Sequence, residues 1–134
     1  VSLKYTRTVD VIKNLIERLI NCLDFVIGRL LDKAVEDRLI SEKPTNPGLK
    51  SNALKKAYGA QFAEIIALYT QLRKIGRAEY KKSSEYRRHV TMTATTDEGV
   101  FMIDIDKSKE LYFKVKQFVE DAEKFISGEE EPED

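Results

Sequence analysis

The chain of 134 residues has no tryptophan and is poor in two residue types that build disulfide frameworks and metal centres, with one cysteine and one histidine. Cys22 cannot form a disulfide within the chain, and its apolar surroundings predict a thiol in the core or at an interface, in a reducing compartment. With only His89, the chain lacks the repeated Glu-x-x-His motifs of a di-iron helical bundle. We therefore expect no disulfide, metal centre or other cofactor.

Long hydrophobic runs are also missing. Asn21, Asp24 and Arg29 interrupt the most apolar region, so no run approaches the roughly 20 residues of a membrane span. The start of the sequence does not have the pattern of a secretory leader. These observations predict a cytoplasmic protein without a membrane partner, and the 34% of charged residues is typical of a thermophile.

Charge is balanced in total but uneven along the chain. Residues 50–96 hold ten basic and three acidic side chains, whereas residues 97–134 hold five basic and thirteen acidic side chains. The formal net charge of zero therefore conceals a basic middle and an acidic end, and by itself it says little about partners.

Apolar spacings of three and four residues predict three helices. The first extends over about residues 6–40, with Thr8 as its N-cap, and the second begins near Pro47 or Ser51 and continues at least to Tyr80. The third is capped by Asp106 or Ser108 and ended by Gly128. Because the first helix is apolar around much of its circumference, we expect it to be covered on more than one side, by the rest of the fold or by a second copy.

Residues 90–105 have a different pattern, in which apolar residues alternate with threonines around the turn sequence TDEG. This pattern predicts a β-hairpin whose apolar face, Val90, Met92, Phe101 and Ile103, lies on the helices. The predicted fold is therefore mainly α: a long antiparallel helical bundle with one β-hairpin inserted before the last helix. Residues 1–128 form its single domain, and residues 129–134 form a disordered acidic tail.

Few residues form a pattern associated with catalysis. Glu85 and His89 are spaced to share a helix face but have no evident third metal ligand, and Asp104 and Asp106 alternate at a strand end, where a helix cap is the simpler interpretation. The sequence contains neither a nucleophile elbow nor a glycine-rich phosphate loop. We predict no catalytic residue.

The segment 73–90, RKIGRAEYKKSSEYRRHV, is the most unusual part of the sequence, with seven basic and two acidic residues. If the second helix continues through it, arginines and tyrosines share one side of that helix. Arginine binds phosphate in a bidentate manner and tyrosine stacks on bases, so RNA is a natural partner. The alternative is a solvated helix face whose arginines pair with the acidic last helix. The predicted ridge consists of Tyr69, Arg73, Arg77, Tyr80, Lys81, Ser84 and Arg88.

The segments LYTQLRKIGRAEY, residues 68–80, and KELYFKVKQFVEDAEKFI, residues 109–126, resemble the HEPN superfamily of small helical proteins over about the last 70 residues. The resemblance implies a dimer. Several members of the family are ribonucleases, often toxins paired with a nucleotidyltransferase antitoxin, and others only bind nucleotides or RNA.

Catalytic members of that family pair an arginine with a histidine, with four to six residues between the two. For His89 the corresponding positions hold Lys82, Ser83 and Ser84, so this pattern is not met. Without a histidine at this spacing from an arginine, no side chain with an ordinary pKa near 7 is placed to transfer protons to and from a ribose hydroxyl.

The leading hypothesis is a non-catalytic, HEPN-like homodimer that binds RNA, a nucleotide or a protein partner, such as a nucleotidyltransferase-like protein, through a basic surface. One alternative is a structural or protein-interaction module without a nucleic-acid role. A third is a toxin-type ribonuclease that uses His89 with an arginine distant in the sequence. The predicted binding residues are Arg73, Arg77, Tyr80, Lys81, Arg87, Arg88 and His89.

Overall fold

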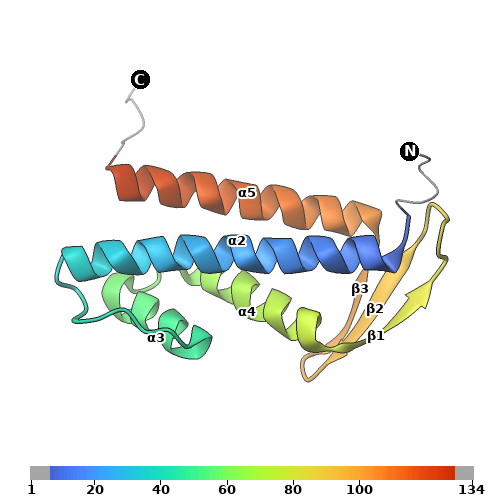
Figure 1. The fold of residues 1–134 in the computed structure, drawn as a ribbon, viewed down its shortest axis with the longest axis horizontal. Helices are drawn as coiled ribbons and strands as arrows, with labels where there is room; N and C mark the ends of the chain where they lie inside the picture. Colours follow the sequence, from blue (N-terminus) through green and yellow to red (C-terminus); the bar gives the residue numbers. More distant parts are fainter. Residues whose placement is uncertain (1–6, 129–134) are drawn as a thin grey trace. The chain divides into compact units, whose positions relative to one another are not determined.

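The structure, a computed structural model, describes residues 7–128. It contains four helices and three strands (Figure 1). The protein is therefore mainly helical with a small antiparallel sheet, as predicted in outline, and the tail predicted for residues 129–134 lies outside the described residues. In chain order the elements are α2 (Val9–Glu36), α3 (Pro47–Tyr58), α4 (Ala63–Arg77), β1 (Glu79–Ser83), β2 (Thr91–Thr96), β3 (Gly99–Ile103) and α5 (Ile105–Ser127).

The chain divides into two compact units. Unit 1 comprises Val1–Ile20 and Thr70–Lys114, and unit 2 comprises Asn21–Tyr69 and Val115–Asp134. Helices α2, α4 and α5 each contribute residues to both units, whereas the whole sheet belongs to unit 1 and α3 to unit 2. No helix within residues 7–128 is both long enough and apolar enough to span a bilayer.

In unit 2 the predicted second helix is broken in two. Asn46 caps α3 by accepting hydrogen bonds from the N–H groups of Gly48 and Leu49, and Pro47 occupies the first turn. The helix ends at Gly59, whose φ of 62° suits a residue without a side chain, and α4 begins at Ala63. The prediction of one helix from Pro47 or Ser51 to Tyr80 is therefore wrong, although its start at Pro47 is confirmed.

An aromatic cluster fills part of unit 2. The rings of Tyr58, Phe62 and Phe125 meet edge to face, with centroids 5.2 to 5.3 Å apart, a favoured arrangement of aromatic rings. Cys22 is exposed, so of the two positions expected for its thiol, the core is wrong and an interface stays a prediction. The buried apolar residues of unit 2 are Leu23, Val26, Ile27, Leu30, Leu31, Ala34, Leu54, Phe62, Ile65, Ile66, Leu68, Tyr69, Val115 and Ala122.

Helix ends in unit 1 are capped by side chains. Thr8 Oγ1 accepts a hydrogen bond from the Val11 N–H at 3.2 Å, which confirms the predicted N-cap of α2. Helix α5 is capped two residues earlier than predicted, because Asp104 Oδ1 accepts from the Lys107 N–H at 2.8 Å. Asp106 lies inside the first turn, and the Ser108 hydroxyl donates to the Asp104 carbonyl. The other end of α5 belongs to unit 2, where Gly128, with φ of 74°, follows the helix as predicted.

The sheet has the order β1-β2-β3, and both pairs of strands are antiparallel. The predicted hairpin is confirmed as β2 and β3, whereas strand β1 was not predicted. One face of the hairpin is buried through Met92, Ala94 and Ile103, and Phe101 on that face is partly buried. Alternation along the strands leaves the other face, with Val100 and Met102, exposed.

Candidate nucleic-acid interface

The basic stretch, residues 73–90, lies entirely in unit 1 and adopts three conformations in succession. Its first residues form the last turns of α4, which ends at Arg77, the next form β1, and residues 84–89 form a loop that we call the basic loop. The predicted arginine and tyrosine ridge on one continuous helix is therefore wrong. From Glu79 onward the backbone pairs with β2 instead, Tyr80 opposite Ala94 and Lys81 opposite Thr93.

Strand geometry separates Tyr80 from Lys81, because successive side chains of a strand point to opposite faces. Tyr80 is half-buried, and the Lys13 ammonium lies 4.6 Å from the centroid of its ring, within the range of a cation–π contact. Lys81 is exposed on the opposite face, beside Thr93. Of these two predicted binding residues, Lys81 is the more accessible to a ligand.

The basic loop is attached to the N-terminus of α2. Glu85 Oε2 accepts a hydrogen bond from the Val9 N–H at 3.2 Å, and the Tyr86 N–H donates to the Arg7 carbonyl at 2.6 Å. A carboxylate is favoured at this position, since the N-terminus of a helix carries a partial positive charge.

The same loop contains backbone strain. Ser84 and Tyr86 have φ of 54° and 65°, in the left-handed region that residues other than glycine rarely adopt. Such strain costs on the order of 1 to 3 kcal/mol per residue and is concentrated in functional segments. The residues that follow, Arg87, Arg88 and His89, are all exposed.

Two lysines of the stretch are neutralised within unit 1. Lys82 contacts Asp10 at 3.2 Å and Glu85 at 3.9 Å, and its hydrogen bond with Asp10 is the main cause of its raised pKa. Lys74 contacts Glu98 at 2.7 Å and Asp97 at 3.5 Å, and its hydrogen bond with Glu98 is the main cause of its raised pKa.

The arginines of the stretch behave differently. Arg77, Arg87 and Arg88 are exposed, and their guanidinium groups form no ion pair or hydrogen bond with any residue from 7 to 128. Two acidic residues of α5 are engaged elsewhere, Glu123 with Arg29 and Glu110 with Lys107. These pairs give no support to the view that the last helix neutralises the basic stretch.

The remaining ridge residues are less accessible. Tyr69 is 2% exposed, and its hydroxyl donates to Asp24 Oδ1 at 2.8 Å, so it cannot act as a stacking surface. Arg73 is half-buried and already takes part in an interaction. The candidate interface therefore reduces to Arg77, Lys81 and the basic loop.

Sequence reasoning did not identify Tyr86 or assign a role to Glu85. Tyr86 is 50% exposed next to Arg87, which makes it the aromatic side chain best placed for stacking in this region. On a continuous helix Tyr86 would lie off the arginine side, and for that reason it was overlooked. The pairing of Glu85 with a helix end 76 residues away has no local signal in the sequence.

Glu85 and His89, which are spaced to share a helix face, lie in the basic loop and not on a helix. The carbonyl of His89 accepts a hydrogen bond from the Thr91 hydroxyl at 2.8 Å, while its exposed ring has no described partner. Within residues 7–128 no three His, Cys, Asp or Glu side chains are grouped so that they could hold a metal ion.

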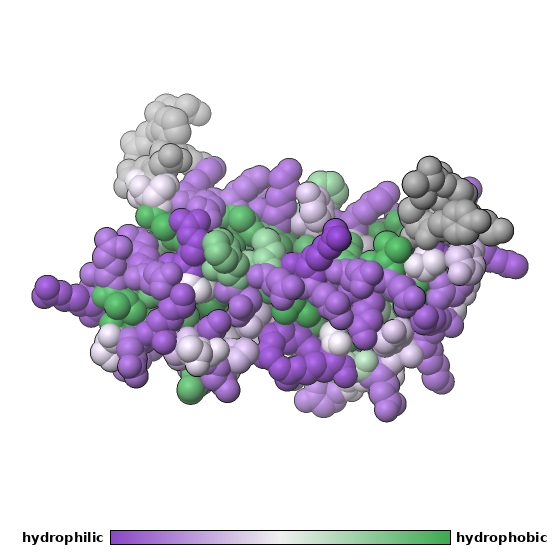
Figure 2. All heavy atoms as spheres, in the orientation of Figure 1, coloured by the Kyte–Doolittle hydropathy of each residue, from purple (hydrophilic) through white to green (hydrophobic). Residues whose placement is uncertain are grey.

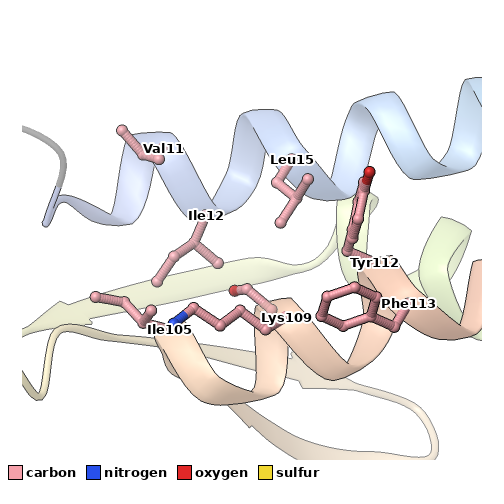
Figure 3. Close-up of a pocket in the computed structure, with 8 residues that line it drawn as sticks. Val11, Ile12, Leu15, Ile105, Lys109, Tyr112 and Phe113 are labelled. Atoms are coloured by element: carbon pink, nitrogen blue, oxygen red, sulfur yellow. The ribbon is translucent and has the colours of Figure 1, made fainter.

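Unit 1 also has an apolar pocket of about 580 Å³ between α2 and α5. Figure 3 shows Tyr112 and Phe113 of α5 beside each other, with Val11 and Leu15 on α2. Two ionisable side chains, Lys109 and Tyr112, line the pocket, and none of the predicted binding residues does. It is lined by Val11, Ile12, Leu15, Ile105, Ser108, Lys109, Tyr112 and Phe113.

Most of the face of the molecule drawn in Figure 2 is hydrophilic, and apolar side chains emerge only in small patches. Comparison of the chain with protein-family models, with curated proteins and with solved structures finds no match.

Proposed function

We propose that the protein is a non-catalytic, HEPN-like module that binds single-stranded RNA through Arg77, Lys81 and the basic loop. The observation that carries this proposal is the set of exposed guanidinium groups that have no ion-pair partner among residues 7–128. Two of them, Arg87 and Arg88, lie in a loop attached to α2. Arginine recognises phosphate oxygens in a bidentate manner, and the exposed ring of Tyr86 offers a base a stacking surface.

Single-stranded RNA fits this arrangement better than a duplex. An exposed aromatic ring can stack on a base only when that base is free of its partner. A single nucleotide could also bind one of these cations through its phosphate, but it is too short to contact several separated cations at once, so its binding energy would be smaller.

The test is fluorescence anisotropy with a labelled oligouridylate of about twelve nucleotides, within the usual site size of single-strand binders. Affinity should fall steeply between about 50 and 200 mM salt, because bound cations release counterions from the phosphates. Substituting both Arg87 and Arg88 by alanine should reduce the slope of log affinity against log salt by about 1.4.

Lys55→Ala with Lys56→Ala is the matched control, since it removes the same charge from exposed positions of α3 in unit 2. An equal loss in both double variants would mean that only net charge matters, and no binding at low salt would end the proposal. The RNA should stay intact. Cleavage that disappears in His89→Ala would replace the proposal with the ribonuclease alternative.

We further propose that the helices form a long antiparallel bundle and that the protein is a cytoplasmic homodimer whose seam includes α2. Phe25, 66% exposed, and Cys22, also exposed, lie one turn apart on that helix. A large exposed aromatic ring is typical of an interface. Phe25→Arg should convert a dimer to a monomer in sedimentation experiments, and a wild-type monomer would refute this part. A nucleotidyltransferase-like protein remains a proposed partner, by the family resemblance alone.

The structural-module alternative keeps one supporting observation, the internal neutralisation of Lys74 and Lys82. It predicts that the protein has no RNA binding that depends on Arg87 and Arg88, and the same RNA titration tests that.

A further inference from the structure

The two edges of the sheet differ in charge. Strand β1 contains Glu79, Lys81 and Lys82, whereas β3, of sequence GVFMI, contains no charged residue and no proline. Its pairing with β2 is regular from the Met92 and Ile103 pair to the Thr96 and Gly99 pair, without a bulge. Charges, prolines and bulges are the usual means of preventing an edge strand from pairing with another chain. Strand β1 therefore has charged side chains that can prevent such pairing, whereas β3 has no charge, proline or bulge.

Register shows which backbone groups of β3 point outward. The two-residue turn is closed by Thr96 and Gly99, and hydrogen-bonded pairs then alternate along an antiparallel ladder. Val100 and Met102 lie between those pairs, so their N–H and C=O groups point away from β2. Their side chains are 62% and 67% exposed, and no residue from 7 to 128 pairs with this outer edge.

Acidic residues lie just beyond both ends of β3. Asp97 and Glu98 precede it and, among residues 7–128, share a single ion-pair partner, Lys74, which leaves the turn with a net negative charge. Asp104, the cap of α5, and Asp106 follow it.

These charges help to decide the occupant. If two copies paired through β3 so that Val100 of one copy met Met102 of the other, Glu98 would lie opposite Asp104. Like charges directly opposite each other destabilise a strand pair. A strand with basic ends would meet attraction at both ends instead.

We propose that β3 binds an extended peptide segment of another protein, with alternating apolar residues and a lysine or arginine at each end, as a fourth strand of the sheet. Backbone hydrogen bonds to Val100 and Met102 supply the affinity, the two exposed side chains pack on the apolar residues of the peptide, and the acidic ends fix its register. This interface uses neither the basic loop nor Arg77, so it does not depend on RNA binding.

The probe is a synthetic peptide of alternating valine and threonine with a lysine at each end. Two control peptides replace the lysines with glutamates, or methylate the backbone nitrogens on one edge. At low salt we expect the lysine-ended peptide to bind at least tenfold more tightly than either control. Equal binding of all three would overturn the proposal.

Variants of the protein locate the site. Val100→Lys and Thr95→Lys add the same charge to cross-strand neighbours on one exposed face, but only Val100 lies on the edge. Met102→Pro removes an N–H that β2 does not use, and edge strands tolerate proline there. We expect at least a tenfold loss of peptide affinity in Val100→Lys and Met102→Pro and little change in Thr95→Lys.

Unchanged affinity in a folded Met102→Pro protein would overturn the proposal, and if that variant does not fold, the methylated peptide decides alone. A wild-type dimer that Met102→Pro dissociates would assign the edge to a second copy and overturn the peptide. If the protein does not bind RNA, these peptide-binding experiments can still be interpreted, because they do not depend on RNA binding.

Discussion

Unit 1 has fourteen Lys or Arg residues and nine Asp or Glu residues, whereas unit 2 has nine and fourteen, so their formal charges are +5 and −5. They also differ in exposed apolar side chains. Among residues 7–128 there are nine large ones, of which six belong to unit 1, while Phe25, Leu39 and Leu49 belong to unit 2. Positive charge and exposed apolar surface are therefore both concentrated in the unit that contains the sheet, and negative charge in the other unit.

In unit 2, aromatic and charged side chains contact one another. Its three clustered rings pack on one another, and Asp24 accepts hydrogen bonds from both Lys50 and the Tyr69 hydroxyl, at 3.1 and 2.8 Å. In unit 1, the ring of Tyr86 and the guanidinium groups of Arg87 and Arg88 face solvent. Aromatic and charged side chains therefore contact one another in unit 2, whereas in unit 1 several of them face solvent and can bind a partner. The same substitution should therefore affect the two units differently.

The largest expected effect is on Phe62 in unit 2. Phe62 is 7% exposed and contacts Tyr58 and Phe125, so Phe62→Ala should lower the free energy of unfolding by about 3 to 5 kcal/mol. Urea unfolding followed by circular dichroism measures this. Phe113→Ala in unit 1 is the control, because Phe113 is 61% exposed, and it should change stability by no more than about 0.5 kcal/mol. Equal losses would remove the distinction between the units.

The next effect concerns tyrosine hydroxyls. Tyr69→Phe removes a hydrogen bond to a charged group and should cost about 1.5 kcal/mol. Tyr86→Phe should cost nothing measurable, since the Tyr86 hydroxyl has no partner among residues 7–128. A double-mutant cycle of Tyr69→Phe with Lys50→Met then measures the coupling through Asp24. A coupling of zero would mean that the two donors act independently.

A third prediction separates the attachment of the basic loop from its charge. Glu85→Ala removes the acceptor of the Val9 N–H and should destabilise the protein by about 1 kcal/mol. Removing a negative charge alone would strengthen RNA binding, whereas a released loop weakens it, so we expect weaker binding. Glu85→Gln keeps an acceptor oxygen and should not weaken binding.

Asn46→Ala is the matched control for Glu85→Ala in unit 2. It removes the cap of α3 at a similar cost and should leave RNA binding unchanged. Tighter binding in Glu85→Ala would show that charge, and not the position of the loop, controls affinity.

The sequence predicted what depends on local signals. The spacing of apolar residues located α2 and α5, and the hairpin followed from alternation and from TDEG. The break at Gly59 was missed because Leu54, Tyr58, Phe62 and Ile65 keep a helical spacing across it. Strand β1 was missed because EYKKS has no apolar alternation and is defined only by its pairing with β2.

The candidate site was predicted as a segment but not as an arrangement. Arg77, Lys81, Arg87 and Arg88 are exposed as expected, whereas the positions of Tyr80 and Tyr69 depend on contacts with Lys13 and Asp24, distant in sequence. Ser84 and Tyr86 have positive φ, but neither is a glycine or an asparagine, the residue types that would indicate such a conformation in the sequence.

The smallest expected effect is alkaline destabilisation of unit 1. The pKa of Lys82 is raised above 10.5, chiefly by its hydrogen bond with Asp10, so the folded state holds this proton more tightly than the unfolded state. The stabilisation is complete below pH 10.5 and is lost as the pH rises through the folded pKa. Lys82→Met should therefore lower the unfolding midpoint slightly at pH 9, and the difference should disappear as the pH rises above the folded pKa. Burial also raises the pKa of Tyr58 in unit 2, but Tyr58 is present in both proteins, and so the difference between them isolates Lys82. A difference that persists at the higher pH would mean that the aliphatic part of Lys82, rather than its charge, stabilises the contact.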